Sequence, residues 1–332
     1  MVNFAVRMNE KARNILKYSV TSLIAVLFIW MVARKVDWSG FWAGLQQTRW
    51  GAVVLFLAAS MMAVLFRTLR WREMIRPVDA GAKFLDIWDA GNVGAVANVA
   101  LPGAGEFLRC AYASRRKEDY SRILGTIVME RVWDLLAICI LIVLALAFNW
   151  NSFAPFLKEA LLTPSADGHS AKIWIVITAV ALVAAASWAC VHFRDRSALC
   201  GKICSAVGGV FQGAGATLKA KKKGLFAVYT ALIWMAYVLM SFFGLKAVPE
   251  LSSLGLSDAL IISSVGNMAS VIPVPSGMGP YHYLIMTTLS GLYQCSNEIG
   301  LLYAVLCHES HAILIILLGA VSYVRLTLRK KK

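Results

Sequence analysis

The chain has 332 residues, of which 59% are hydrophobic and only 15% are charged, and its mean hydropathy is +0.67. Ordinary soluble domains carry about 25% charged residues, so this composition excludes a soluble protein and indicates a polytopic membrane protein. The net charge of +15 does not indicate a nucleic-acid partner, because the basic residues form short clusters beside apolar segments and not one basic domain.

Six apolar segments predict membrane spans. In chain order they are residues 18–33, 51–66, 123–148, 173–193, 225–248 and 298–326. The first runs into Arg34 and Lys35 without a small-residue cleavage site, so we expect an uncleaved span and not a signal peptide.

Tryptophans and arginines surround the second span. Residues 36–49 predict an outer loop, because Trp38, Trp42 and Trp50 suit the interfacial aromatic belt. Arginines at positions 67, 70, 72 and 76 are expected to stop the span on the cytoplasmic side.

Two further segments predict re-entrant hairpins. Residues 84–114 are broken at Pro102, and residues 257–294 are broken between Pro273 and Pro280. Their arms are too short to cross about 30 Å of hydrocarbon, so we expect the first to enter from the cytoplasm and the second from outside. Paired Gly/Pro-interrupted segments in corresponding places are typical of a transporter's binding site.

Basic residues orient the spans. Of the 33 Lys and Arg residues, 26 fall in segments predicted to lie inside, so both termini are expected in the cytoplasm of a cell (inner) membrane. The sequence thus predicts an all-α, polytopic membrane helix bundle, a single transmembrane domain over residues 1–332. Its halves, 1–148 and 172–332, would be inverted repeats whose hairpin tips approach each other near the midplane.

Charged residues cluster on the first hairpin and the third span. Glu130 and Asp134 share one helix face, and Arg131 lies about a third of a turn away. On one interpretation Arg109 and Arg131 bind a lipid phosphate, while Glu106 and the two span carboxylates hold the arginines. On the other, the charges form an ion-pair network that only locks the hairpin against the span.

Three histidines form a second group. His308 and His311 share a helix face and with His282 could bind a metal, relay a proton, contact a headgroup or serve as hydrogen-bonded structural residues. We predict no metal and no cofactor. The candidate substrate-binding residues are Asn98, Glu106, Arg109, Glu130, Arg131, Asp134, His282, His308 and His311.

These residues belong to three motifs. Asn-x-x-x-Pro-x-x-Gly-Glu-x-x-Arg covers residues 98–109, Glu-Arg-x-x-Asp covers 130–134, and Pro-x-Gly-x-Gly covers 275–279. In them the chain resembles the membrane region of the lysylphosphatidylglycerol synthase and flippase-like family. Two places depart from the family pattern: Pro280-Tyr-His282 stands where many relatives carry Glu, and residues 307–311 lack an expected Arg.

The resemblance implies movement of a phospholipid or polyprenyl-linked headgroup between leaflets, with a membrane lipid as the partner. The soluble aminoacyl-transferase domain is absent, so we expect no enzymatic activity. Two alternatives stay open: a non-transporting lipid-binding partner of a membrane glycosyltransferase or envelope enzyme, and an ion-coupled small-solute transporter. Nothing in the sequence predicts an oligomeric state.

Overall fold

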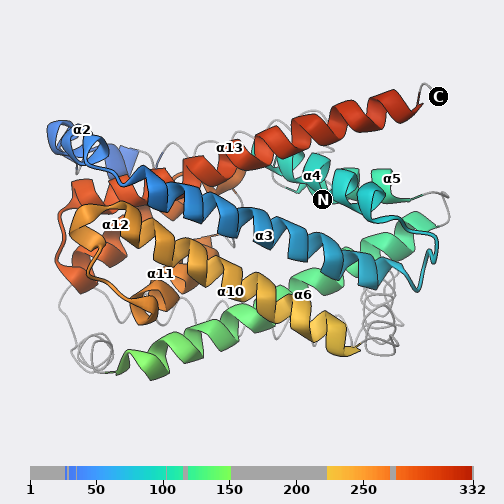
Figure 1. The fold of residues 1–332 in the computed structure, drawn as a ribbon, viewed down its shortest axis with the longest axis horizontal. Coiled ribbons are helices and arrows are strands. Elements are labelled where there is room, and N and C mark those ends of the chain that lie inside the picture. Colours follow the sequence, from blue (N-terminus) through green and yellow to red (C-terminus); the bar gives the residue numbers. More distant parts are fainter. Residues whose placement is uncertain are drawn as a thin grey trace, which may run out of the picture.

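The computed structural model describes Leu27 and residues 30–34, 36–101, 103–114, 119–150, 223–269 and 274–330. Every regular element in these ranges is a helix (Figure 1), so the predicted all-α bundle is confirmed. The predicted first span, 18–33, lies mostly outside the described residues, and the fourth, 173–193, lies entirely outside them.

Within the described ranges, four helices are long and apolar enough to cross a membrane. They are α3 (Trp50–Ile75), α6 (Tyr120–Phe148), α10 (Lys223–Ala247) and α13 (Asn297–Lys330). They confirm the predicted second, third, fifth and sixth spans. Helix α3 continues past Phe66 to Ile75 and carries Arg67, Arg70 and Arg72, which were expected to follow the second span; where this span ends in the membrane stays a prediction.

The segment predicted as an outer loop before α3 contains a short helix, α2 (Trp38–Gln46), which was not predicted. Asp37 caps this helix by accepting a hydrogen bond from the Ser39 N–H at 3.1 Å. The Asp37 N–H in turn donates to Glu298 Oε1 on α13 at 2.9 Å. These contacts and the buried Phe41 attach α2 to the start of α13.

Two helix–break–helix segments lie where the sequence places the hairpins. The first consists of α4 (Phe84–Ala100) and α5 (Ala104–Ala113), and the second of α11 (Leu256–Ala269) and α12 (Pro280–Tyr293) with the short turn η3 (Pro275–Gly277) between them. At 1.5 Å per residue the longest arm measures about 25 Å, which is less than the hydrocarbon thickness. Their depth in a membrane stays a prediction.

The first break depends on three glycines and one asparagine. Gly103 adopts φ +82°, a left-handed conformation that side chains disfavour. A Cβ at Gly105 would lie 1.9 Å from the Gly94 carbonyl oxygen, so the two arms touch through their backbones. Asn98 Oδ1 accepts a hydrogen bond from the Gly105 N–H at 2.8 Å and thereby satisfies a free donor in the first turn of α5.

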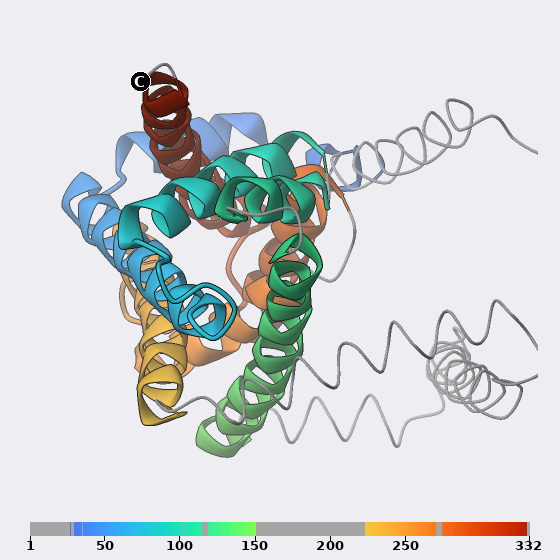
Figure 2. The same ribbon diagram turned by 90° about the vertical axis from the view of Figure 1, so that its right-hand side faces the viewer.

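The halves of the chain are interlocked. Helix α3 packs along α10, while α4 packs on α13 and α11 packs on α6, so each hairpin lies against a long helix of the other half. Exchanging the halves turns the contact of α4 with α13 into that of α11 with α6 and leaves the contact of α3 with α10 unchanged, as a repeat requires. The hairpins lie toward opposite ends of the long axis (Figure 1), and the view along that axis places α4 and α5 between α3 and α6 (Figure 2).

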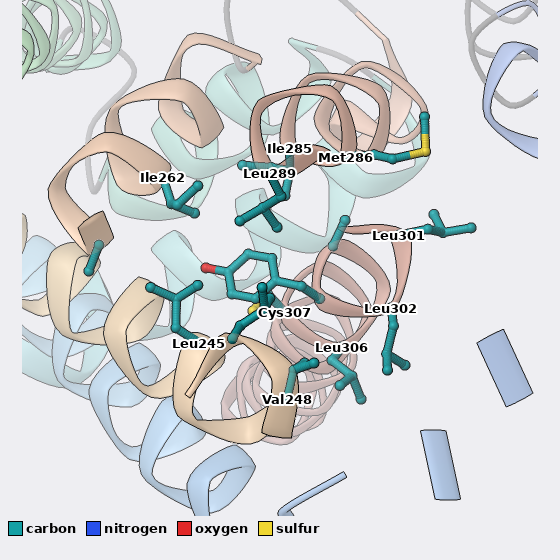
Figure 3. Close-up of a cluster of buried hydrophobic side chains, with 14 of the residues drawn as sticks. Leu245, Val248, Ile262, Ile285, Met286, Leu289, Leu301, Leu302, Leu306 and Cys307 are labelled. Carbon is teal, nitrogen blue, oxygen red and sulfur yellow. The ribbon is translucent and has the colours of Figure 1, made fainter. Parts of the chain in front are cut away.

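Buried apolar side chains form two clusters. One joins α3, α4, α5 and α6 around Trp71, Ile87 and Ile123. The other lies mainly among α10, α11, α12 and α13 (Figure 3). Burial of such side chains within each group of helices holds the groups together and leaves polar residues to meet between them.

Candidate functional site

A cavity of about 790 Å³ lies where the two hairpin tips meet the long helices. Helix α4 contacts η3 here, so the tips of both hairpins border one space. Its walls come from α3, α4, α5, α6 and α13, with Gly103 from the first tip and Ser276 and Gly277 from the second. The volume falls within the range of about 300–1,000 Å³ that is usual for small-molecule sites.

An ion-pair network holds α5 against α6 on one wall. Arg109 pairs with Glu106 (Nε–Oε2 2.8 Å) and with Glu130 (Nη2–Oε2 2.7 Å). Arg131 closes the network through a contact of its Nη2 with Glu106 Oε1. The Arg109 guanidinium also lies over the Trp71 ring, 4.8 Å from its centroid, a favourable cation–π geometry.

Helix α3 contributes two further arginines. Arg70 Nη2 donates to Asp134 Oδ1 at 2.7 Å and to Glu130 Oε1 at 3.3 Å. Arg67 Nη2 donates to the same Glu130 oxygen at 3.4 Å. Glu130 therefore contacts three arginines, which is how a side chain only 1% exposed keeps its charge compensated.

The four arginines differ in how firmly they are held. Arg70 is 0% exposed and Arg109 is buried, so their guanidinium groups are committed to carboxylates. The Arg131 side chain is 52% exposed and that of Arg67 is 34% exposed, and both line the cavity. Four arginines face three carboxylates, so this described network has one uncompensated positive charge.

Of the three predicted histidines, two line the cavity and the third packs beside it. His308 and His311 line the cavity, and His311 Nδ1 lies 2.6 Å from Ser60 Oγ. His282 is buried on α12 and is not among the cavity-lining residues; its Nε2 lies 3.6 Å from Glu309 Oε1. His308 Nδ1 contacts the same oxygen at 2.9 Å.

The structure thus brings eight of the nine predicted residues to one cavity. They are Asn98, Glu106, Arg109, Glu130, Arg131, Asp134, His308 and His311. Sequence reasoning assigned Arg67 and Arg70 only to the cytoplasmic end of a span. Their spacing of three residues, which places them on one helix face, was the available signal. Sequence reasoning did not include Glu309 among the candidate site residues, although this residue adjoins His308.

Comparison with known protein families assigns the chain to one of them. The family model described as the transmembrane region of lysylphosphatidylglycerol synthase matches residues 15–319. The chain belongs to this lysylphosphatidylglycerol synthase membrane-region family. The matched range includes every helix that borders the cavity, so the resemblance predicted from three motifs is confirmed. No curated protein and no solved structure matches the chain.

Membership of the lysylphosphatidylglycerol synthase membrane-region family and the four apolar helices establish a membrane protein. The matched part of the family is its membrane region, where the charged cavity lies. The cavity is therefore the feature from which the function of this membrane region is inferred.

Proposed function

We propose that this protein is a lipid transporter of the cell membrane, which moves the headgroup of a phospholipid or polyprenyl-linked lipid between leaflets through the cavity at the two hairpins. The observation that carries the proposal is the excess of one arginine over the carboxylates in the ion-pair network, which comprises the charged lining of a cavity bordered by both hairpin tips and the buried Arg70. A phosphodiester bears one negative charge and would neutralise that excess.

Arg67 and Arg131 are the proposed phosphate ligands. Both line the cavity and retain exposed guanidinium surface, and the planar guanidinium fork matches phosphate oxygens. Arg70 and Arg109 are positioning residues in this scheme, because both are buried and Arg70 Nη2 and Arg109 Nε and Nη2 hold Glu106, Glu130 and Asp134. Asn98 would keep the first tip in place through Gly105.

The arrangement of the hairpins supports transport over binding alone. The two hairpins approach the cavity from opposite ends of the bundle (Figure 1), and contacts within one half have counterparts in the other. Repeats related in this way commonly enclose a central site that opens alternately to either face. Charged residues retained in a membrane protein at such a site are typical of a substrate pathway.

A translocation assay tests the proposal. The protein would be reconstituted into liposomes with fluorescently labelled phosphatidylglycerol, phosphatidylcholine, a polyprenyl phosphate or a phosphate-free diacylglycerol. We expect protein-dependent flux of a phosphate-bearing lipid and none of diacylglycerol. Arg131→Ala and Arg67→Ala should each reduce flux by about tenfold or more, the value of a charge-assisted hydrogen bond.

Arg76→Ala is the matched control, because Arg76 lies on the same helix as Arg67 but pairs with Glu73 outside the cavity. It should leave flux unchanged. If no lipid crosses faster than in protein-free vesicles, the transport proposal is wrong. Lipid that stays bound to the purified protein in that case would favour the non-transporting lipid-binding partner.

A further inference from the structure

A second polar cluster lies beside the cavity and is not used by the proposed transport site. It joins His282 on α12 with His308 and Glu309 on α13. One ligand-capable atom from each residue lies within 4.8 Å of the other two. The cluster is partly open, because 41% of the Glu309 side chain is exposed, while the two histidines are largely buried.

The hydrogen bonds of His308 define its tautomer. Its Nε2 lies 2.9 Å from the Ser276 carbonyl oxygen, which can only accept, so Nε2 carries a proton. In neutral imidazole the other nitrogen, Nδ1, then presents a lone pair. That lone pair faces Glu309 Oε1 at 2.9 Å, and two acceptors at this separation repel each other unless a cation lies between them.

We propose that His282, His308 and Glu309 form a binding site for a divalent transition metal of the zinc type. His308 would bind through Nδ1, His282 through Nε2 and Glu309 through a carboxylate oxygen. Ligands about 2.0–2.1 Å from a tetrahedral zinc ion lie about 3.3 Å from each other. The separations of 2.9 Å and 3.6 Å around Glu309 Oε1 bracket that value, and all three ligand atoms lie within 4.8 Å of one another.

The surroundings of the cluster fit this chemistry. A metal-bound histidine generally donates its second ring N–H to a carbonyl or carboxylate, as His308 Nε2 does to Ser276. His282 Nδ1 accepts from the Gly279 N–H at 3.4 Å, a long contact that has to open when His282 Nε2 binds the metal.

The site would also fix the second hairpin tip. His308 already contacts Ser276, which is held at φ +56° in η3. A metal joining α12 to α13 would tie the tip and the helix that follows it to α13. Metal binding therefore should stabilise the folded protein, because an ion that binds only the native state shifts the unfolding equilibrium toward it.

Zinc binding to purified full-length protein tests the site without any lipid substrate. After treatment with a chelator, titration calorimetry with Zn²⁺ and a thermal-unfolding scan would be run on the wild type and on His308→Ala, His282→Ala and Glu309→Gln. We expect each variant to bind about one Zn²⁺ fewer per chain and to lose the zinc-dependent rise in Tm. His311→Ala is the matched control, because His311 lies one turn further along α13 and contacts Ser60 instead.

Equal zinc stoichiometry in the wild type and the three variants would overturn the proposal. The proposal would also be overturned if the wild type bound no zinc and nuclear magnetic resonance showed both ring nitrogens of His308 protonated. The cation between His308 and Glu309 would then be a proton. A variant that is not monodisperse would be replaced by His308→Gln, which keeps a polar side chain but lacks an imidazole.

Discussion

Arg70 donates to Asp134 across 2.7 Å, and its side chain is completely buried. This contact joins α3 to α6, two helices separated by the whole first hairpin. Through this pair, α3 supports the charged wall that α6 contributes to the cavity. A buried charge whose partner is removed is strongly destabilising, so the pair allows a direct test of the network.

We expect Arg70→Met to lower the free energy of unfolding by about 3–5 kcal/mol, because Asp134 loses its partner inside the bundle. Arg76→Met should change it by less than about 1 kcal/mol, because Arg76 and Glu73 form a more exposed pair on the same helix. Thermal unfolding in detergent measures both. The double variant Arg70→Met with Asp134→Asn should recover part of the loss, and strict additivity would contradict the contact.

The first hairpin should not tolerate a side chain at its closest approach. Gly105→Ala would place a Cβ 1.9 Å from the Gly94 carbonyl oxygen, and backbone cannot move aside as a flexible side chain can. We expect little monodisperse protein from this variant. Gly91→Ala on the same hairpin should be produced normally, because no atom lies within 4 Å of its Cβ position. Size-exclusion profiles compare the two.

Removal of the Asn98 side chain tests the tip more gently. Asn98→Ala deletes the acceptor of the Gly105 N–H and should cost about 1 kcal/mol, the usual value of such a cap. The protein should remain folded, with faster hydrogen exchange in residues 103–108. Unchanged exchange there would indicate that the hydrogen bond does not hold the tip.

Helix α13 packs tightly against α4 at Gly319. A Cβ here would lie 2.1 Å from Val96 Cγ2 and 3.0 Å from the Asn92 carbonyl oxygen. Gly319→Ala should therefore lower Tm, and Val96→Ala in the same chain should restore part of it by removing the nearer obstacle. Rescue should stay incomplete, since the backbone contact persists. Full tolerance of Gly319→Ala alone would show that the helices are further apart.

The cap of α2 should respond to acid. Hydrogen bonds from the Ser39 hydroxyl, and then from its backbone N–H, lower the pKa of Asp37 below its ordinary value of 3.8. The ionised cap therefore stabilises α2 at all pH values above that ordinary value, and this contribution is lost as the pH falls through the lowered pKa. Hydrogen exchange of α2, corrected for intrinsic rates, should accelerate there in the wild type and not in Asp37→Asn.

The sequence predicted the helices and hairpins well because their signals are local. Prolines and glycines clustered at residues 102–105 and 273–280 interrupt a helix, so the bounds 84–114 and 257–294 could be placed within a residue or two. The helix over Trp38–Gln46 was missed although Asp37 and Ser39 form a recognisable N-terminal cap. The tryptophans in this segment indicated a loop at the membrane interface instead.

The candidate site was predicted only in part because partners come from distant segments. Glu106, Arg109, Glu130 and Arg131 stand in conspicuous motifs, and the structure joins them directly. Nothing local distinguishes Arg70 from a cytoplasmic anchor, since its pairing with Asp134 depends on how α3 packs on α6. The same holds for Glu309, whose contact with His282 is made only when α12 folds onto α13.

Helix α13 contacts both hairpins, namely α4 of the first and the tip of the second. Near its end it packs on α4 and pairs Arg329 with Asp86 at 2.8 Å, while its middle holds Ser276 through His308. One continuous rod thus links the two ends of the molecule. A ligand that displaces one hairpin through α13 would change the conformational free energy of the other hairpin. Thermodynamic reciprocity requires this coupling free energy to be the same in both directions.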